Sequence, residues 1–246
     1  MTGFAGMDMQ LGPLTLRSVV VARFRLVAQA GPRPEVELVA RVLVVDGPAG
    51  RTLIDAGPES PAALSGVLEE KGISSDSIDR LVLTHLHADH AGGAPIPGKA
   101  IHVHARNLSA ALEPTHAEGR AYRRTDVERV NTSLLVPTQG ADEIAPGLRV
   151  TVSSGHTPGM QIVWIEGGGE TVIASGDLIP TLSHIRLAGS GEYDVDPGLL
   201  ENEKRVLIEE ALRRRAWLFF YHDMRHVAVR LGGTPERPVA VEEVRF

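Results

Sequence analysis

The most constraining feature of this sequence is the stretch at residues 84–93, which places three histidines and one aspartate within six residues. The apolar run Leu81-Val82-Leu83 leads into it, and a glycine pair closes it. An apolar run bounded by turn residues is typical of a buried strand that ends in a loop. Layered α/β proteins build their sites at such strand ends. The stretch therefore predicts a functional site at the end of a strand.

The spacing of these side chains suits metal ions. His85 and His87 are two positions apart, so on an extended backbone both rings point to the same side and can chelate one cation. Asp89 continues this alternation, and the adjacent His90 points elsewhere, which favours a second metal held by these two residues. Imidazole and carboxylate ligands favour Zn, Mn, Fe or Co over Ca or Mg. A solvated polar loop is the alternative, but such loops rarely carry this pattern between an apolar strand and Gly-Gly.

The pattern His-x-His-x-Asp-His at residues 85–90 resembles the signature of the metallo-β-lactamase superfamily and matches it in full. The resemblance implies an α/β fold, a four-layer αβ/βα sandwich, with a site for one or two metals at one edge. It also implies further ligands in a set order along the chain. No internal repeat or linker divides the sequence, so we expect residues 1–246 to form a single domain of this type.

Three residues match the later ligand positions of the family. His156 lies in the loop Gly-His-Thr-Pro-Gly and would complete a three-histidine set with His85 and His87, the ligand count of an open zinc site. Asp177 follows the apolar run 171–174 and resembles the bridging aspartate, which the β-lactamases proper lack. His222 follows the run 217–221 and would complete the second site with Asp89 and His90. His226 is the rival, but the strand-end position favours His222.

One further aspartate matches a supporting position of the family. Asp55 ends the predicted strand at residues 51–54, where the family carries an aspartate that holds the metal loop by hydrogen bonds and does not bind metal. The simpler interpretation is a turn residue, because Asp and Gly both favour turns. The resemblance favours the supporting role.

The composition excludes several classes of protein. The chain has no cysteine, so disulfides, thiolate metal ligands and a cysteine nucleophile are excluded. A formal net charge of −6 without a polybasic run argues against nucleic acid as a partner. The N-terminus does not resemble a signal peptide, and no apolar run approaches the ~20 residues of a membrane span. We therefore expect a soluble, cytoplasmic protein without a membrane partner.

Local patterns predict the main elements and leave some residues open. Helices begin at Ser60-Pro61 and Asp196-Pro197, since each pair combines a capping side chain with a proline at the first helical position. Residues 1–13 are expected to form a loose end, and residues 113–131 a helical insertion near the site mouth whose role stays open. We expect His102 and His104 to lie on the polar face of a strand and His116 to be exposed to solvent. His184 either lines the pocket or is buried. Strands are expected at residues 14–27, 35–46, 51–54, 80–84, 99–104, 134–136, 148–152, 161–165, 171–174, 217–221, 227–231 and 239–244, and loops include residues 31–34.

The resemblance implies a metal-dependent hydrolase with two Zn²⁺ per chain, or Mn, Fe or Co in their place. Two dications lower the pKa of a shared water and polarise a carbonyl oxygen, so a metal-bridging hydroxide would attack an ester-like bond. Asp89 would orient this nucleophile and shuttle a proton to the leaving group. The leading substrate is a small molecule, a lactone or a carboxylic ester, and the family resemblance is compatible with a homodimer.

Two alternatives stay open at this point. A mononuclear iron persulfide dioxygenase would use His85, His87 or His156 with Asp177 and leave the second site empty. A thioesterase of glyoxalase II type usually carries a separate C-terminal helical region, which the sequence does not indicate. Lactonases of the best-known type have a tyrosine three residues after the bridging aspartate, where this chain has Pro180. Their substrate contacts therefore do not transfer directly.

Overall fold

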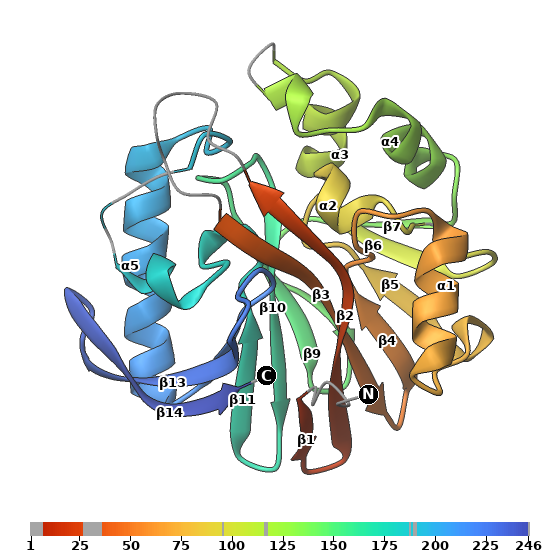
Figure 1. The fold of residues 1–246 in the computed structure, drawn as a ribbon. Coiled ribbons are helices and arrows are strands. Elements are labelled where there is room, and N and C mark those ends of the chain that lie inside the picture. Colours follow the sequence, from red (N-terminus) through yellow and green to blue (C-terminus); the bar gives the residue numbers. More distant parts are fainter. Residues whose placement is uncertain are drawn as a thin grey trace.

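The computed structural model describes residues 7–26, 36–94, 96–115, 118–186, 188 and 191–245. In this part of the chain two seven-stranded sheets lie face to face, and helices cover their outer faces (Figure 1). The first sheet has the order β1 (Asp8–Leu11), β2 (Leu14–Leu26), β3 (Val36–Gly47), β4 (Gly50–Ile54), β5 (Arg80–Val82), β6 (Ala100–His104) and β7 (Leu135–Thr138). The second sheet has the order β14 (Arg237–Arg245), β13 (His226–Thr234), β12 (Trp217–Phe219), β11 (Glu170–Ala174), β10 (Met160–Gly167), β9 (Leu148–Ser153) and β8 (Asp142–Ala145).

Helices and short turns connect these strands. The helices are α1 (Pro61–Glu70), α2 (Ala88–Ala91), α3 (Ala105–Leu112), α4 (Arg124–Asn131) and α5 (Pro197–Arg214). The 3-10 turns are η1 (Ser75–Ser77), η2 (Glu118–Arg120), η3 (Gly176–Leu178) and η4 (Leu182–Ile185). Strands β4 to β7 run parallel to one another, as do β11 and β12, and the other neighbours are antiparallel.

The four-layer sandwich follows from strands that are apolar on both faces. Neighbouring residues of one strand enter different cores: Leu53 packs toward the helices over the first sheet, and Ile54 packs between the sheets. In the second sheet Phe219 also enters the middle core, whereas Leu218 packs against α5. Strands covered on both faces read as continuous apolar runs, which is what the sequence shows. The predicted αβ/βα sandwich is confirmed.

Both predicted helix starts are confirmed. The Ser60 hydroxyl accepts a hydrogen bond from Ala63 N at 3.3 Å, and α1 begins at the proline that follows. The Asp196 carboxylate accepts one from Leu199 N at 2.9 Å at the start of α5. A side-chain oxygen at this position satisfies a backbone N–H that has no partner within the helix.

Some boundaries differ from the expectations. Residues 1–13 were expected to be a loose end, which is wrong for residues 8–11, because they form β1 and pair with β2. Met7 and Leu11 are each 1% exposed, so apolar packing between the sheets orders this segment. Strands β13 and β14 extend beyond their expected bounds. Helical structure in the insertion at 113–131 is confirmed by η2 and α4, whereas His116 and the loop at 31–34 lie outside the described residues.

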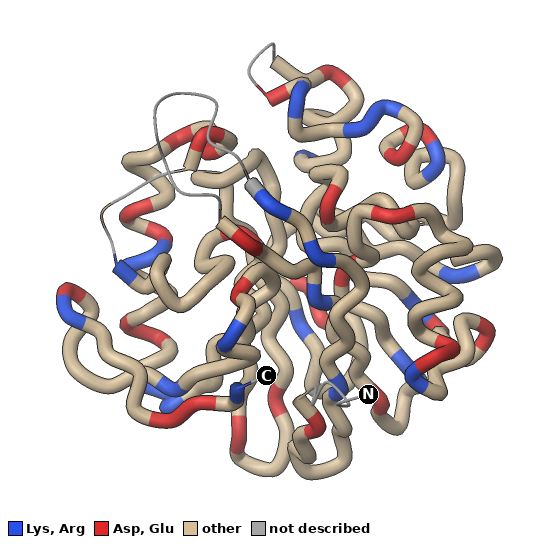
Figure 2. Tube along the Cα trace, viewed as in Figure 1, with Lys and Arg blue, Asp and Glu red and all other residues tan. Residues whose placement is uncertain are grey.

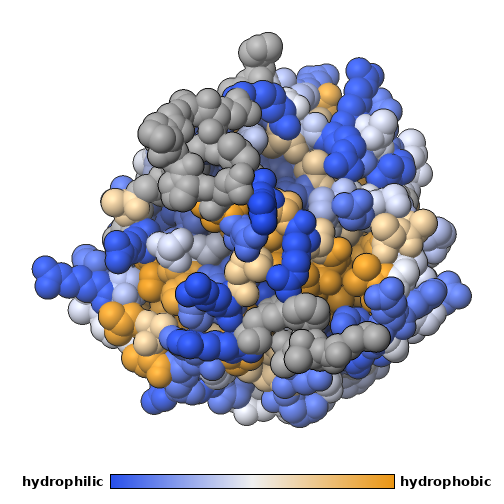
Figure 3. All heavy atoms as spheres, in the orientation of Figure 1, coloured by the Kyte–Doolittle hydropathy of each residue, from blue (hydrophilic) through white to orange (hydrophobic). Residues whose placement is uncertain are grey.

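The described surface is mixed in charge and in polarity. Acidic and basic residues are interspersed along the trace (Figure 2). Polar atoms dominate the face drawn in Figure 3, with apolar atoms between them near the β13–β14 hairpin, where Val239 and Val241 are 53% and 59% exposed. Among the described helices, none is long and apolar enough to cross a membrane.

A buried arginine links the two sheets at the edge where the strand ends meet. Arg41 on β3 is 0% exposed, and its guanidinium donates to Phe220 O at 2.8 Å and to Asp223 O at 2.9 Å. Burial lowers the pKa of Arg41 to about 10, although the negative charge of Asp223 acts to raise it. The side chain therefore stays charged at neutral pH and ties β3 to the turn after β12, which carries His222.

We predict that Arg41→Leu destabilises the fold. The change leaves two buried carbonyl groups without this donor, and each such loss costs about 1–3 kcal/mol. Chemical denaturation should show a free energy of unfolding lower by about 2–5 kcal/mol. Arg25→Leu is the matched control, because Arg25 lies 63% exposed in a surface ion pair with Glu37. Equal stability of the two variants would contradict a structural role for Arg41.

Candidate metal centre

Four loops from the two sheets bring all seven predicted ligands together. The loop after β5 supplies four of them, and the loops after β9, β11 and β12 supply one each. They form two groups. Within each group, the ligand atoms of the side chains all lie within 4.8 Å of one another. The first group is His85, His87 and His156, and the second is Asp89, His90, Asp177 and His222.

The local backbone explains why the signature divides between the two groups. The chain stays extended to His87, whose φ and ψ are −59° and 149°, and then turns into α2. The expectation that Asp89 continues an extended alternation is wrong, because Asp89 and His90 lie on this short helix. The change from strand to helix geometry directs their ligand atoms to the second group, while the ring of His90 still lies 4.0 Å from that of His85.

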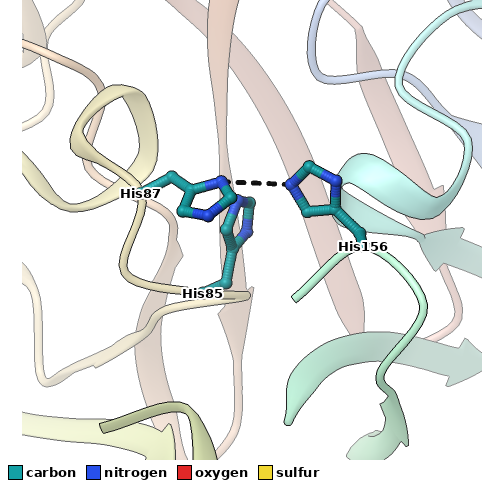
Figure 4. Close-up of side chains that lie close together, drawn as sticks. All are labelled: His85, His87 and His156. Atoms are coloured by element: carbon teal, nitrogen blue, oxygen red, sulfur yellow. Dashed lines mark hydrogen bonds between the residues drawn. The ribbon is translucent and has the colours of Figure 1, made fainter. Parts of the chain in front are cut away.

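The first group has the spacing of ligands around one cation (Figure 4). His87 Nδ1 lies 3.1 Å from His156 Nε2, and the ring of His85 lies against both, with centroid distances of 4.5 Å and 5.0 Å. Zn–N bonds of 2.0–2.1 Å in a tetrahedron place the ligand atoms ~3.3 Å apart. The three imidazoles therefore converge at a distance that fits one metal ion.

Asp177 faces both groups. Its Oδ1 lies 3.3 Å from His90 Nε2 and 3.4 Å from His222 Nε2, both in the second group. Its Oδ2 lies 3.6 Å from His156 Nε2, in the first group. Asp89 Oδ2 is 3.4 Å from His222 Nε2. One carboxylate is thus shared between the groups, which is the geometry of a bridging ligand.

Buried polar atoms without partners also fit metal ions. His85 Nε2, His90 Nε2 and Asp177 Oδ1 are buried and have no hydrogen-bond partner among the described residues. An unsatisfied buried polar group costs about 1–3 kcal/mol. A cation between the donors of each group would satisfy all three atoms. The residues present therefore fit a dinuclear metal site.

His90 and His222 each have an outer ring nitrogen, Nδ1, that faces away from the group and an inner one, Nε2, that faces Asp177. Hydrogen bonds to the outer nitrogens leave the inner nitrogens free for metal. Asp55 Oδ2 lies 2.9 Å from His90 Nδ1, and His222 Nδ1 donates to Val39 O at 2.8 Å. Asp55 Oδ1 also accepts from Thr84 N at 2.7 Å, and Asp55 holds the left-handed conformation with φ 61°. Such partners set the tautomer and orientation of a metal-binding histidine. Asp55 thus makes the hydrogen bonds to the metal loop that the family resemblance implied.

The two groups differ in protonation. Burial, with the charge of His156 next, lowers the pKa of His87 to about 3, and burial also lowers the pKa of His85 well below its usual value. In the second group burial alone would lower the pKa of each histidine, but the negative charges of Asp177 and the neighbouring carboxylates outweigh the effect of burial. They raise the pKa of His222 to about 9 and that of His90 well above its usual value. Metal binding to the second group therefore competes with protons.

The other predicted histidines lie outside both groups. His104 Nδ1 accepts from Arg106 N and caps α3, so the second His-x-His is no metal ligand pair in this geometry. His226 Nδ1 lies 3.2 Å from Asp223 Oδ1, so the structure places His222 in the group in preference to His226. His184 Nδ1 lies 2.7 Å from the Thr181 hydroxyl.

Asn107 is a supporting residue that the sequence analysis missed. Its Oδ1 accepts from Leu86 N at 2.9 Å, and its Nδ2 donates to Pro158 O at 3.0 Å. This buried side chain joins the loop of His85 to the loop of His156. A lone asparagine on a helix carries no sequence signal of such a role.

A cleft of ≈340 Å³ opens over the two groups. The insertion at 113–131 borders it through Arg120, Ala121 and Arg123, as expected of a segment near the site mouth. Tyr122 packs its ring 4.9 Å from that of His87. The cleft is lined by Ala22, Arg23, Phe24, Pro58, Glu59, His87, Ala88, Asp89, Arg120, Ala121, Arg123, His156, Asp177 and Tyr193.

Sequence comparison relates the chain to metal-dependent enzymes. The family model of the metallo-β-lactamase superfamily matches residues 37–222. The chain is similar to an N-acyl homoserine lactonase of Bacillus thuringiensis, with 27% identity over 164 residues. That match covers 64% of this chain and 61% of the lactonase, so the chain spans less than two thirds of this relative's length.

Solved structures share the fold. A probable metal-dependent hydrolase from Staphylococcus aureus has a TM-score of 0.85 and 21% identity, over 97% of this chain and 99% of that one. AidC, a dizinc quorum-quenching lactonase in complex with a product, has a TM-score of 0.82 and 16% identity, over 97% of each chain. At such identities the likeness shows a common fold.

We predict that the two groups differ in how their metal affinity depends on pH. His222, with a pKa of about 9, must lose a proton to bind metal at neutral pH, whereas His87, with a pKa of about 3, is already neutral. Below pH 9 the second group should lose ~10-fold or more in Zn²⁺ affinity per pH unit, because metal and protons compete. The first group should change less than the second from pH 8 to 6, because His85 and His87 are already neutral there. Competition titrations with a chromophoric chelator measure both constants, and parallel curves would contradict the assignment.

Proposed function

The chain belongs to the metallo-β-lactamase superfamily, and from this we propose that it is a metal-dependent hydrolase that cleaves an ester-like bond. The leading substrate is a small molecule, a lactone or a carboxylic ester. The proposed metals are two Zn²⁺ per chain, with Mn, Fe and Co as alternatives for the same nitrogen and oxygen ligands. The dizinc lactonase that shares the fold supports the choice of zinc.

Each residue of the two groups has a proposed role. His85, His87 and His156 would hold the first metal, and Asp89, His90 and His222 would hold the second. Asp177 would be shared by the two metals. The position of Asp177 carries the proposal, since its two oxygens face different groups at 3.3–3.6 Å from their nitrogens.

Two dications bound in this way supply a water-derived nucleophile near neutral pH and an electrophilic contact for the carbonyl oxygen of the substrate. The chain supplies the remaining steps. The side chain of Asp89 is 35% exposed and lines the cleft, so it can reach both the attacking water and the leaving oxygen. In this proposal Asp89 would accept a proton from the nucleophilic water and would pass it to the leaving oxygen, which would become an alcohol. The Tyr221 hydroxyl donates to Asp89 O at 2.7 Å and holds its backbone in place.

The cleft and the relatives support a lactone or ester. Ala22 and Phe24 form an apolar part of the cleft wall, and Tyr193 adds an aromatic ring. An apolar wall beside a polar centre suits an acyl compound whose carbonyl meets the metals. Among similar curated proteins is an N-acyl homoserine lactonase, whose name specifies a lactone substrate. During hydrolysis the charge would develop on the ester group of the substrate, beside the metals. The apolar wall of the cleft would bind the rest of the substrate.

We predict that Asp177→Ala lowers the metal content toward one per chain. Removal of the shared carboxylate leaves both groups with one ligand fewer and brings two cations together without an anion between them. Metal content per chain by mass spectrometry measures the effect. Asp8→Ala is the control, because Asp8 lies 77% exposed on β1. Two metals retained in Asp177→Ala would refute the bridging role.

We predict that His87→Ala abolishes hydrolysis while the fold stays intact. The first metal loses one of three imidazole ligands, and loss of a metal ligand should lower turnover by at least ~100-fold. A panel of acyl-homoserine lactones and aryl esters measures turnover, and circular dichroism reports on the fold. His102→Ala is the matched control, since His102 is a partly buried histidine outside both groups.

Several outcomes would overturn the proposal. Unchanged turnover in His87→Ala would contradict the site assignment. One iron per chain, with oxygen uptake on a persulfide and no ester turnover, would replace the hydrolase with the dioxygenase. About two zincs with lactone or ester turnover is the expected result.

A further inference from the structure

His156 reaches the first group from the second sheet. His85 and His87 follow β5 of the first sheet, whereas His156 lies in the loop between β9 and β10. The signature therefore does not place the third imidazole. Contacts of its own loop must do so. Asn107 holds Pro158 in this loop, and the contacts to His156 itself and to residues 153–155 come from residues 194–203.

Asp194 holds the ring of His156 from the outer side. Asp194 Oδ1 lies 2.7 Å from His156 Nδ1, and the carboxylate side chain is only 8% exposed. The opposite nitrogen, His156 Nε2, faces His87 and Asp177. A proton on Nδ1 that is donated to Asp194 leaves the lone pair of Nε2 directed at the first group. Gly191 N donates to the second oxygen of Asp194 and holds the carboxylate in turn.

Among the described residues, Asp194 is the carboxylate that lies at hydrogen-bond distance from a histidine of the first group. His85 Nδ1 meets the hydroxyl of Thr84 at 3.1 Å, which is a neutral partner. In the second group Asp55 takes the same position against the outer nitrogen of His90. Asp194 is thus the counterpart of Asp55 for the three-histidine group, supplied by a segment 38 residues after His156. A carboxylate behind a histidine ligand raises its basicity and fixes its orientation.

The same region also fixes the backbone of the His156 loop. Val195 N donates to His156 O at 3.2 Å, and Asp196 N donates to Gly155 O at 2.9 Å. The start of α5 lies so close that a Cβ on Gly155 would come within 2.4 Å of Leu200 N. The loop therefore rests directly on the first turn of α5.

Glu203 completes this support. Its carboxylate accepts from the Ser153 hydroxyl at 2.6 Å and from Ser154 N and Gly155 N at 2.9 Å each. Three donors from successive residues converge on one side chain. Because Glu203 lies inside α5, these bonds tie the loop to a long helix that is packed on the second sheet.

We propose that Asp194 is the positioning residue of the first metal, acting through His156, and that Glu203 holds the loop in which His156 lies. The inference rests on the proposed metal site, though not on its substrate. Tyr193 lines the cleft and is the neighbour of Asp194, so one loop shapes the cleft wall and orients a metal ligand.

The test is the Zn²⁺ affinity of the first group in Asp194 variants. Asp194→Ala removes the outer partner of His156 and should weaken the first site 10- to 100-fold. Asp194→Asn keeps the shape and an acceptor oxygen but not the charge, so it should show a smaller loss. Titration of Zn²⁺ against a chromophoric chelator measures these constants. A repeat in a His222→Ala background isolates the first group from the second.

Two further measurements separate positioning from general loss of structure. Asp196→Ala is the matched control in the same loop, because its carboxylate caps α5 at Leu199 N. It should lower Tm without weakening the first site. Amide hydrogen exchange on the metal-free chain should show faster exchange at residues 153–159 in Glu203→Gln than in the wild type.

The outcomes distinguish this inference from the proposed function. A wild-type chain that binds two Zn²⁺, with unchanged first-site affinity in Asp194→Ala, would overturn the inference alone. Equal weakening by Asp196→Ala would also overturn it, because the effect would then belong to the stability of the loop. A wild-type chain that binds no Zn²⁺ would overturn the metal site and the inference together.

Discussion

Imidazoles and carboxylates buried against one another at the edge of the two sheets are the interaction on which the rest of the structure depends. Charged groups in such a place are tolerated only when they are paired, and loss of one partner of a buried pair costs about 3–5 kcal/mol. The second group meets this condition without metal, because Asp177 stands between His90 and His222. In the first group His85 and His87 stay neutral, since burial lowers the pKa of His87 to about 3 and that of His85 well below its usual value.

The layered fold provides the rigid frame for this arrangement. Apolar residues on both faces of the central strands pack the sheets against each other and against their helices, and the ligand loops lie at the ends of these strands. Figure 1 shows the arrangement of the layers. Arg41 and Asn107 bridge the loops that carry the ligands, through carbonyl and amide groups of the backbone. The packing of the sheets thus brings the loops with the ligands together.

The hydrogen-bond partners on the outer side of the histidines orient the rings. Asp55 and Val39 O hold protons on the outer nitrogens of His90 and His222, so the inner nitrogens face Asp177. Asp194 does the same for His156. These partners come from different parts of the chain, so the two groups have different surroundings.

The sequence by itself determined the local geometry of this protein. Strand and helix periodicity, the capping residues Ser60 and Asp196, and the resemblance carried by residues 85–90 were sufficient for the four layers and the seven candidate ligands. The residues alone could not place His156 and His222 beside the signature, and only the family order did so. The tertiary structure alone decided that α2 turns Asp89 and His90 toward the second group, that residues 8–11 form a strand, and that Asp194 lies behind His156. The physical reason is that periodicity and caps report contacts within a few residues, whereas the contact of Asp194 with His156 and the packing of Leu11 between the sheets join distant segments.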